Sequence, residues 1–155
     1  MEAQDKILFK NHLKHFCRNT IEQRIAAAKE MIQNAREAAN SEEKSSAGDK
    51  YETGRAMGHL QQDMHARQLA GYIKEMAGLH AINSSLLYDC VTPGAFIETT
   101  IALFFVAAGL GKQVMEGKTI FFLSPRTPLA IALLDKKIGD SFYFNGERGV
   151  ITNLF

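Results

Sequence analysis

The first half of the chain carries a regular repeat of small and branched apolar residues. The repeat advances in alternating steps of four and three through Ile21, Ile25, Ala28, Ile32, Ala35 and Ala39. Residues at this spacing share one face of a helix and form the hydrophobic seam of a coiled coil. No proline occurs before Pro93, so nothing in this stretch forces a helix to stop. The repeat therefore predicts a long helix that packs against a partner.

A second helical pattern runs from about Lys50 to His80. The Ser-, Glu- and Gly-rich stretch Asn40–Gly48 is predicted to connect the two helices. Two helices of about 30 residues joined by a short polar link are expected to pack antiparallel. We therefore predict a coiled-coil hairpin over residues 1–82. The apolar residues of its second helix are Met57, Leu60, Met64, Leu69, Ile73 and Met76.

The second half has a different character, because eight of the ten phenylalanines and all three prolines lie after residue 90. A short helix is predicted over Thr127–Leu134, with Thr127 as its N-cap and Pro128 at its first position. Asn145-Gly146 is a strong two-residue hairpin signal. Residues 83–155 are thus expected to form a small antiparallel sheet with one helix, which makes the fold α+β. The predicted strands are Phe96–Thr100, Ile101–Ala108, Lys118–Leu123, Ser141–Phe144 and Gly149–Leu154.

The composition excludes several classes of protein. The 155 residues include 18 basic and 17 acidic side chains, which argues against a globally basic nucleic-acid binder. Two cysteines cannot form a disulfide framework and fit a reducing, cytoplasmic setting. The longest apolar stretch, Ile101–Ala108, is much shorter than the roughly 20 residues that cross a membrane. Charged residues precede any apolar run at the N-terminus, so we expect no secretory signal and a soluble protein.

Two acidic residues stand at the predicted start of the second helix. Asp49 and Glu52 are three positions apart, within the stretch Gly48-Asp49-Lys50-Tyr51-Glu52, so both lie on one helix face. Two carboxylates at the end of a long hairpin are a partial ligand set for Mg²⁺, which takes oxygen ligands and keeps several waters. Acidic residues are also common in first helical turns for purely structural reasons, and the spacing alone fits that interpretation as well.

A basic stripe lies near the N-terminus. Lys6, Lys10, Lys14 and Arg18 are each four residues apart and so share one helix face. Such a stripe suits the phosphates of RNA. It also fits an ordinary solvated helix surface.

These features together resemble the Gre family of bacterial transcript-cleavage factors. The stretch Gly48–Glu52 is similar to that family's Gly-Asp-x-x-Glu tip, and Thr127–Leu134 followed by Asp135–Asp140 resembles its conserved Ser-Pro-Leu-Gly-containing stretch. Ala130 and Asp135 stand where the family usually has glycine, and the connection before Gly48 is longer than the family's tip. The two matches occur in the family's order and, with the hairpin, cover most of the chain.

The resemblance implies a specific function. The hairpin would enter the secondary channel of bacterial RNA polymerase and present Asp49 and Glu52 to the active site, where they would help to hold a catalytic Mg²⁺ for cleavage of backtracked RNA. The basic stripe would face the RNA 3′ end. Residues 83–155 would be an FKBP-like domain that docks on polymerase through Thr127 and Pro128. The protein would stimulate another enzyme's chemistry, with no small-molecule substrate and no membrane partner.

Two other functions remain open at this point. Some proteins of this shape bind the same channel and modulate or inhibit polymerase without promoting cleavage. A structural coiled-coil adaptor that does not contact polymerase is the more distant alternative.

Overall fold

The computed structural model describes the backbone of residues 1–44 and 49–155, and the side chains of residues 1–41 and 53–155. The chain divides into two compact units. One consists of residues 19–76, and the other combines residues 1–18 with residues 77–155. We call them the hairpin unit and the sheet unit. The predicted boundary between residues 82 and 83 differs from this division. The sheet unit also includes residues 1–18 and 77–82, which were predicted to belong to the hairpin.

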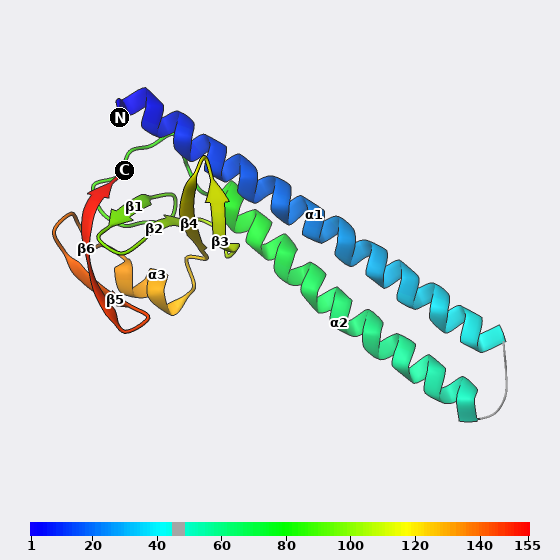
Figure 1. Cartoon of the computed structure of the whole chain (residues 1–155). Helices are drawn as coiled ribbons and strands as arrows, with labels where there is room; N and C mark the ends of the chain where they lie inside the picture. The colour runs from blue at the N-terminus through cyan, green and yellow to red at the C-terminus, as the bar shows by residue number, and fades with distance from the viewer. Residues whose placement is uncertain (45–48) are drawn as a thin grey trace. The chain divides into compact units, whose positions relative to one another are not determined.

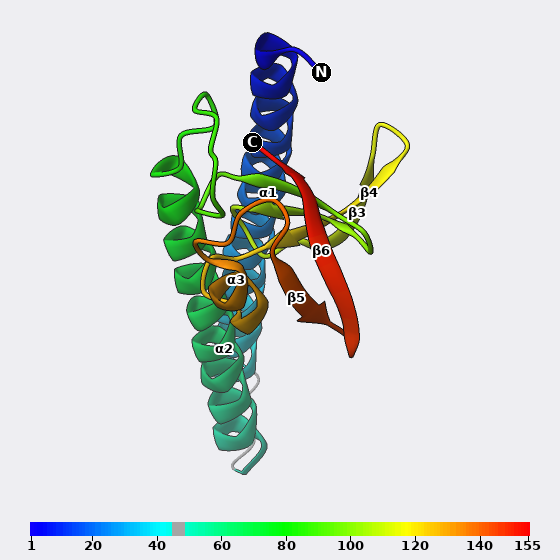
Figure 2. The same ribbon diagram turned by 90° about the vertical axis from the view of Figure 1, so that its left-hand side faces the viewer.

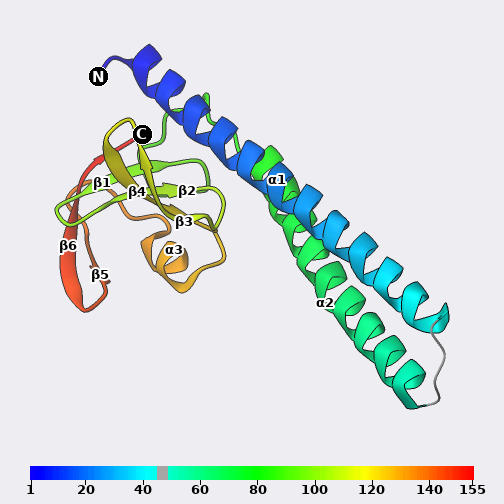
Figure 3. The ribbon, with the colours of Figure 1, turned by 45° about the vertical axis from the view of Figure 1, so that its right-hand side comes forward.

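The hairpin unit is made from two long helices. They are α1 (Ala3–Lys44) and α2 (Asp49–His80), which run side by side in opposite directions (Figures 1 and 3). The repeat predicted on the first helix is confirmed, since Ile21, Ala28, Ala35 and Ala39 are buried. The first helix is longer than predicted, because it continues through residues 40–44, which are part of the predicted connection. Glu, Lys and Ser lie there without Gly or Pro, and Glu and Lys are good helix formers.

The second helix packs through a different face from the one its apolar residues suggest. Met57, Leu60 and Met64 are 54%, 65% and 50% exposed, whereas Gly58 is buried against α1. A Cβ atom added to Gly58 would lie 2.8 Å from the Cβ of Ala39. Small residues on both helices therefore bring the two backbones close together.

The sheet unit contains a six-stranded, mostly antiparallel sheet with the order β3-β4-β2-β1-β6-β5. Strands β2 and β4 pair in parallel, so the prediction of a purely antiparallel sheet is wrong for this pair. Strand β3 was not predicted; it lies between β2 and β4 in the sequence and forms a hairpin with β4. The strands are β1 (Phe96–Thr99), β2 (Leu103–Val106), β3 (Gly111–Met115), β4 (Lys118–Leu123), β5 (Ser141–Phe144) and β6 (Glu147–Leu154).

Local turn and cap signals in this unit are confirmed. Strands β5 and β6 pair directly around Asn145 and Gly146, whose φ angles are 52° and 77°, as a type I′ turn requires. Helix α3 (Pro128–Leu133) begins after Thr127, whose side chain accepts a hydrogen bond from the Ala130 amide. These residues fix where the chain reverses and where the short helix begins.

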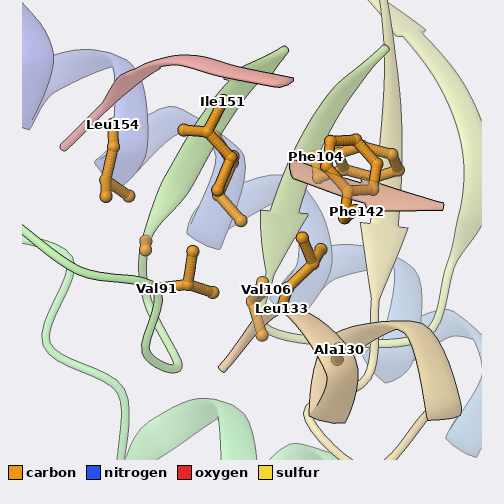
Figure 4. Packing of buried hydrophobic residues seen from close by; sticks show 10 residues of the cluster. Val91, Phe104, Val106, Ala130, Leu133, Phe142, Ile151 and Leu154 are labelled. Atoms are coloured by element: carbon orange, nitrogen blue, oxygen red, sulfur yellow. The ribbon is translucent and has the colours of Figure 1, made fainter. Parts of the chain in front are cut away.

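The sheet and α3 enclose one hydrophobic core. Figure 4 shows Ala130 and Leu133 of α3 beside Val106 of β2, with Phe104 and Phe142 packed close by. The rings of Phe104 and Phe142 meet edge to face, with centroids 5.9 Å apart. The buried cluster consists of Val91, Ala95, Ile97, Phe104, Val106, Ala130, Leu133, Phe142, Ile151 and Leu154.

The first turns of α1 complete the other side of the sheet unit. The Phe9 ring lies 4.9 Å from Phe96 and 6.4 Å from Phe155, and the Phe16 ring lies 5.6 Å from Phe122. The C-terminal end of β6 is beside these turns (Figure 2). Residues 1–18 are therefore part of the sheet unit's hydrophobic core.

Candidate functional site

The basic stripe lies within the sheet unit and is largely engaged by it. The Lys10 side chain is 0% exposed. Its Nζ donates hydrogen bonds to the carbonyl oxygens of Leu86, at 2.5 Å, and Gly94, at 3.2 Å. The same ammonium lies 4.5 Å from the centre of the Tyr88 ring, a cation–π contact. Lys10 therefore joins α1 to the segment between α2 and β1.

Burial has an electrostatic consequence for this lysine. Desolvation lowers the pKa of Lys10 from 10.5 to about 8, because a charged ammonium is less favourable away from water. The side chain still carries its charge at neutral pH. The RNA contact of Lys10 stays a prediction, and in the structure its ammonium is engaged by these internal contacts.

The other three members of the stripe differ in exposure. Lys6 is half-buried, with Nζ 5.2 Å from the centre of the Phe155 ring. Lys14 is half-buried, and its Nζ donates to the Ile82 carbonyl oxygen at 2.5 Å. Arg18 is exposed, with a guanidinium nitrogen 2.7 Å from Nδ1 of His15. The stripe is therefore divided between internal contacts and a smaller exposed part.

Lys14 and Arg18 line a polar cavity of about 570 Å³ between α1 and the segment that follows α2. Asn11 and His15 line the same cavity from α1, and His80 lines it from the last turn of α2. Sequence reasoning missed this site because its residues are far apart in the sequence. In the sequence, the basic stripe was the signal for this site, because two of its members, Lys14 and Arg18, line the cavity from α1.

The acid pair lies at the start of α2. Asp49 is the first residue of the helix, and Glu52 follows three positions later in the same turn. The side chains of Asp49 and Glu52 lie outside the described residues. The donor set, two carboxylates one helical turn apart, suits part of a Mg²⁺ shell and leaves other positions for ligands from elsewhere. Within residues 1–41 and 53–155, no three His, Cys, Asp or Glu side chains come together as a metal site.

The residues predicted to dock on polymerase lie at the start of α3. Thr127 is occupied as the N-cap, and Pro128 is exposed in the first turn. Three exposed apolar side chains follow on and after the helix: Ile131 is 60%, Leu134 48% and Ile138 58% exposed. We call these three residues the α3 apolar patch. Sequence periodicity does not separate these residues from the buried Ala130 and Leu133, because Ile131 follows Ala130 directly and Leu134 is the C-cap, outside the regular helix.

Comparisons with protein-family models, curated proteins and solved structures found no match to this chain. None of the described helices is long and apolar enough to cross a membrane.

Proposed function

We propose that the protein is a Gre-like transcription elongation factor of the cytoplasm that binds bacterial RNA polymerase through its secondary channel and stimulates cleavage of backtracked RNA. The observation that carries this proposal is the pair Asp49 and Glu52 in the first turn of the second helix of a long hairpin. A narrow two-helix hairpin is the kind of element that fits a channel. Its acids are at the end where the two helices connect, which would be the leading end.

The role of the acid pair follows from charge. Phosphodiester cleavage places negative charge on the attacking and leaving oxygens, and a bound Mg²⁺ would supply the positive charge that stabilises them. Asp49 and Glu52 would hold and orient that ion together with ligands from polymerase. Their position at a helix N-terminus favours the ionised carboxylates that such binding needs. The chain would remain a stimulatory factor, because polymerase supplies the RNA and the remaining ligands.

The sheet unit supports the docking part of the proposal. We propose that it is FKBP-like and that Thr127, Pro128 and the α3 apolar patch contact polymerase. Asp135, which stands where the Gre family usually has glycine, has a φ of 65°, a conformation that glycine adopts most easily. Gly139, later in the same stretch, has a φ of 94°. The backbone is thus consistent with a glycine-containing family pattern at both positions.

The test uses stalled, backtracked elongation complexes with labelled RNA. We expect wild-type protein to shorten the transcript, and the double variant Asp49→Asn, Glu52→Gln to lower the rate on the order of 100-fold, the scale seen when a charge-stabilising group is removed. The matched control is Asp63→Asn with Glu30→Gln, which makes the same charge change at exposed positions of the hairpin. This control should cleave like wild type.

Three results would contradict parts of this proposal. Binding without cleavage would assign the chain to the channel-binding regulators, for which the α3 apolar patch supplies the docking surface. Cleavage by the double variant would remove Asp49 and Glu52 from the mechanism. Absence of any polymerase binding would overturn the proposal and leave the adaptor function.

A further inference from the structure

The cavity lined by Lys14 and Arg18 is positively charged. These two side chains carry permanent charges at neutral pH, and two histidines, His15 and His80, lie beside them. Among the residues that the structure describes, those that line the cavity include no Asp or Glu. Basic side chains gathered in this way favour an anionic ligand.

The hydrogen bonds around the cavity leave donors available to a ligand. A guanidinium group has no acceptor, so Arg18 donates to Nδ1 of His15. The bond holds Arg18 in place and uses only one of its five N–H groups. Lys14 similarly uses one of three N–H groups on the Ile82 carbonyl. Both cations are oriented by the fold and retain hydrogen-bonding capacity.

The neutral part of the cavity is also fixed by internal contacts. Ser84 is only 5% exposed, and its hydroxyl donates to Oδ1 of Asn11 at 2.5 Å. The amide NH₂ is then the remaining polar end of Asn11, and it is a donor. This side of the site adds a neutral donor to the two cations. Such a mixture suits a phosphate group, which is rich in acceptor oxygens.

We propose that this cavity binds the phosphate group of a small, nucleotide-sized molecule. Its volume of about 570 Å³ lies within the range of roughly 300–1,000 Å³ for small-molecule sites. An RNA backbone would need cations along several consecutive phosphates. The stripe offers no such track, because Lys10 is buried and Lys6 lies against the Phe155 ring. This inference goes beyond the proposed polymerase function and does not depend on it.

The test titrates the full chain, without polymerase, with inorganic phosphate, pyrophosphate and ATP at constant ionic strength. Calorimetry gives the affinity, and amide chemical shifts locate the site. We expect saturable binding, with shift changes concentrated in residues 11–18 and 79–85. Equal affinity for all three would identify the phosphate group alone as the determinant. Tighter binding of ATP would extend the ligand to a nucleotide. Both results support the proposal.

Substitutions identify the cavity as the site. Arg18→Gln should weaken binding about tenfold, in line with the loss of a charge-assisted hydrogen bond. The control Arg148→Gln makes the same charge change at an exposed position of β6 and should leave the affinity within about twofold. Equal loss in both variants, or no saturable binding, would overturn the proposal. So would binding of an RNA octamer without a terminal phosphate when none of the three small anions binds.

Discussion

Lys10 shows how one buried charge can connect two distant segments of a chain. Its ammonium satisfies carbonyl oxygens at residues 86 and 94 and contacts an aromatic ring. A buried charge is costly unless its hydrogen bonds are made, and here two bonds and a cation–π contact offset part of the cost. A methionine of similar length would fill the space but would leave both carbonyls without this donor.

The stability contribution of Lys10 should depend on pH. Its pKa is about 8 in the folded protein and near 10.5 when exposed, so the unfolded state binds more protons between these values. Stability therefore rises with pH through this window. Relative to Lys10→Met, the free energy of unfolding of wild type should be constant below about pH 8 and should increase between pH 8 and 10.5. Urea denaturation across this range measures the difference.

The control for this experiment is Lys29→Met, because Lys29 is an exposed lysine on the same helix. Its difference from wild type should not vary with pH across the window. A flat curve for Lys10→Met, or one that falls as pH rises, would show that burial does not shift the titration of Lys10.

At the scale of the helices, close approach of small residues defines the hairpin packing around Gly58. Gly58 on α2 faces Ala39 on α1, and the carbonyl oxygen of Ala35 is 3.7 Å from where a Cβ of residue 58 would lie. Leu60 and Met64, which are larger, lie on an exposed face. Substitution at residue 58 should therefore affect packing more strongly than substitution on the exposed face.

Gly58→Ala tests this packing directly. Alanine gains up to about 1 kcal/mol of helix propensity over glycine, but its Cβ would lie 2.8 Å from that of Ala39. Overpacking of this kind costs about 1–3 kcal/mol, so we expect a net loss of stability. Thermal unfolding followed by circular dichroism measures the effect as a lower Tm.

Gly71→Ala is the matched control, because nothing lies within 4 Å of its added Cβ and the propensity gain should raise Tm. Adding Ala39→Gly to Gly58→Ala should recover much of the lost stability by removing the contacting atom. An increase in Tm for Gly58→Ala alone would mean that the two helices separate without cost.

The elements that the sequence predicted are those specified by local signals. The turn at Asn145-Gly146 and the Thr127 cap depend on residues a few positions apart, and both are present. Strand β3 escaped prediction because Gly111, Lys112 and Gln113 are weak strand formers, and its pairing with β4 supplies the stability. The parallel pairing of β2 with β4 is likewise a tertiary property that no local pattern encodes.

The same distinction applies to the candidate sites. The acid pair and the basic stripe could be found from spacing within one helix. The cavity requires His80 and Ser84 to lie against Asn11 and Lys14, contacts between residues about 70 positions apart. Lys10 is buried through contacts with residues 86 and 94, which are distant in the sequence. Its position in the basic stripe could therefore not predict that it is buried.

At the scale of the whole molecule, a single helix belongs to two units. Residues 1–18 contribute Phe9, Leu13 and Cys17 to the core of the sheet unit. The remainder of α1 belongs to the hairpin unit. The sheet unit should therefore fold only when residues 1–18 are present.

We predict that residues 1–18, joined to residues 77–155 by a flexible linker of about six residues, fold into the sheet unit. Arg18 and Leu79 line one cavity, so the two chain ends to be joined lie near each other. A Gly/Ser linker of about six residues spans roughly 13 Å. A fragment of residues 83–155 alone should expose Phe96, Phe122 and Phe155 and bind a hydrophobic dye. Dispersed amide spectra for the linked chain, and their absence for the fragment, check this. A well-folded fragment would contradict the shared core.

The contacts made by Lys10 and Lys14 have a consequence for sequence change. Both ammonium groups bind main-chain oxygens, at residues 82, 86 and 94, and every amino acid carries such an oxygen. The lysines are therefore constrained, while the side chain of a partner such as the exposed Leu86 is free to vary without altering the hydrogen bond. Substitutions in residues 82–94 therefore need no compensating substitution on α1. A search for correlated substitutions would not detect the contact between these two parts of the chain.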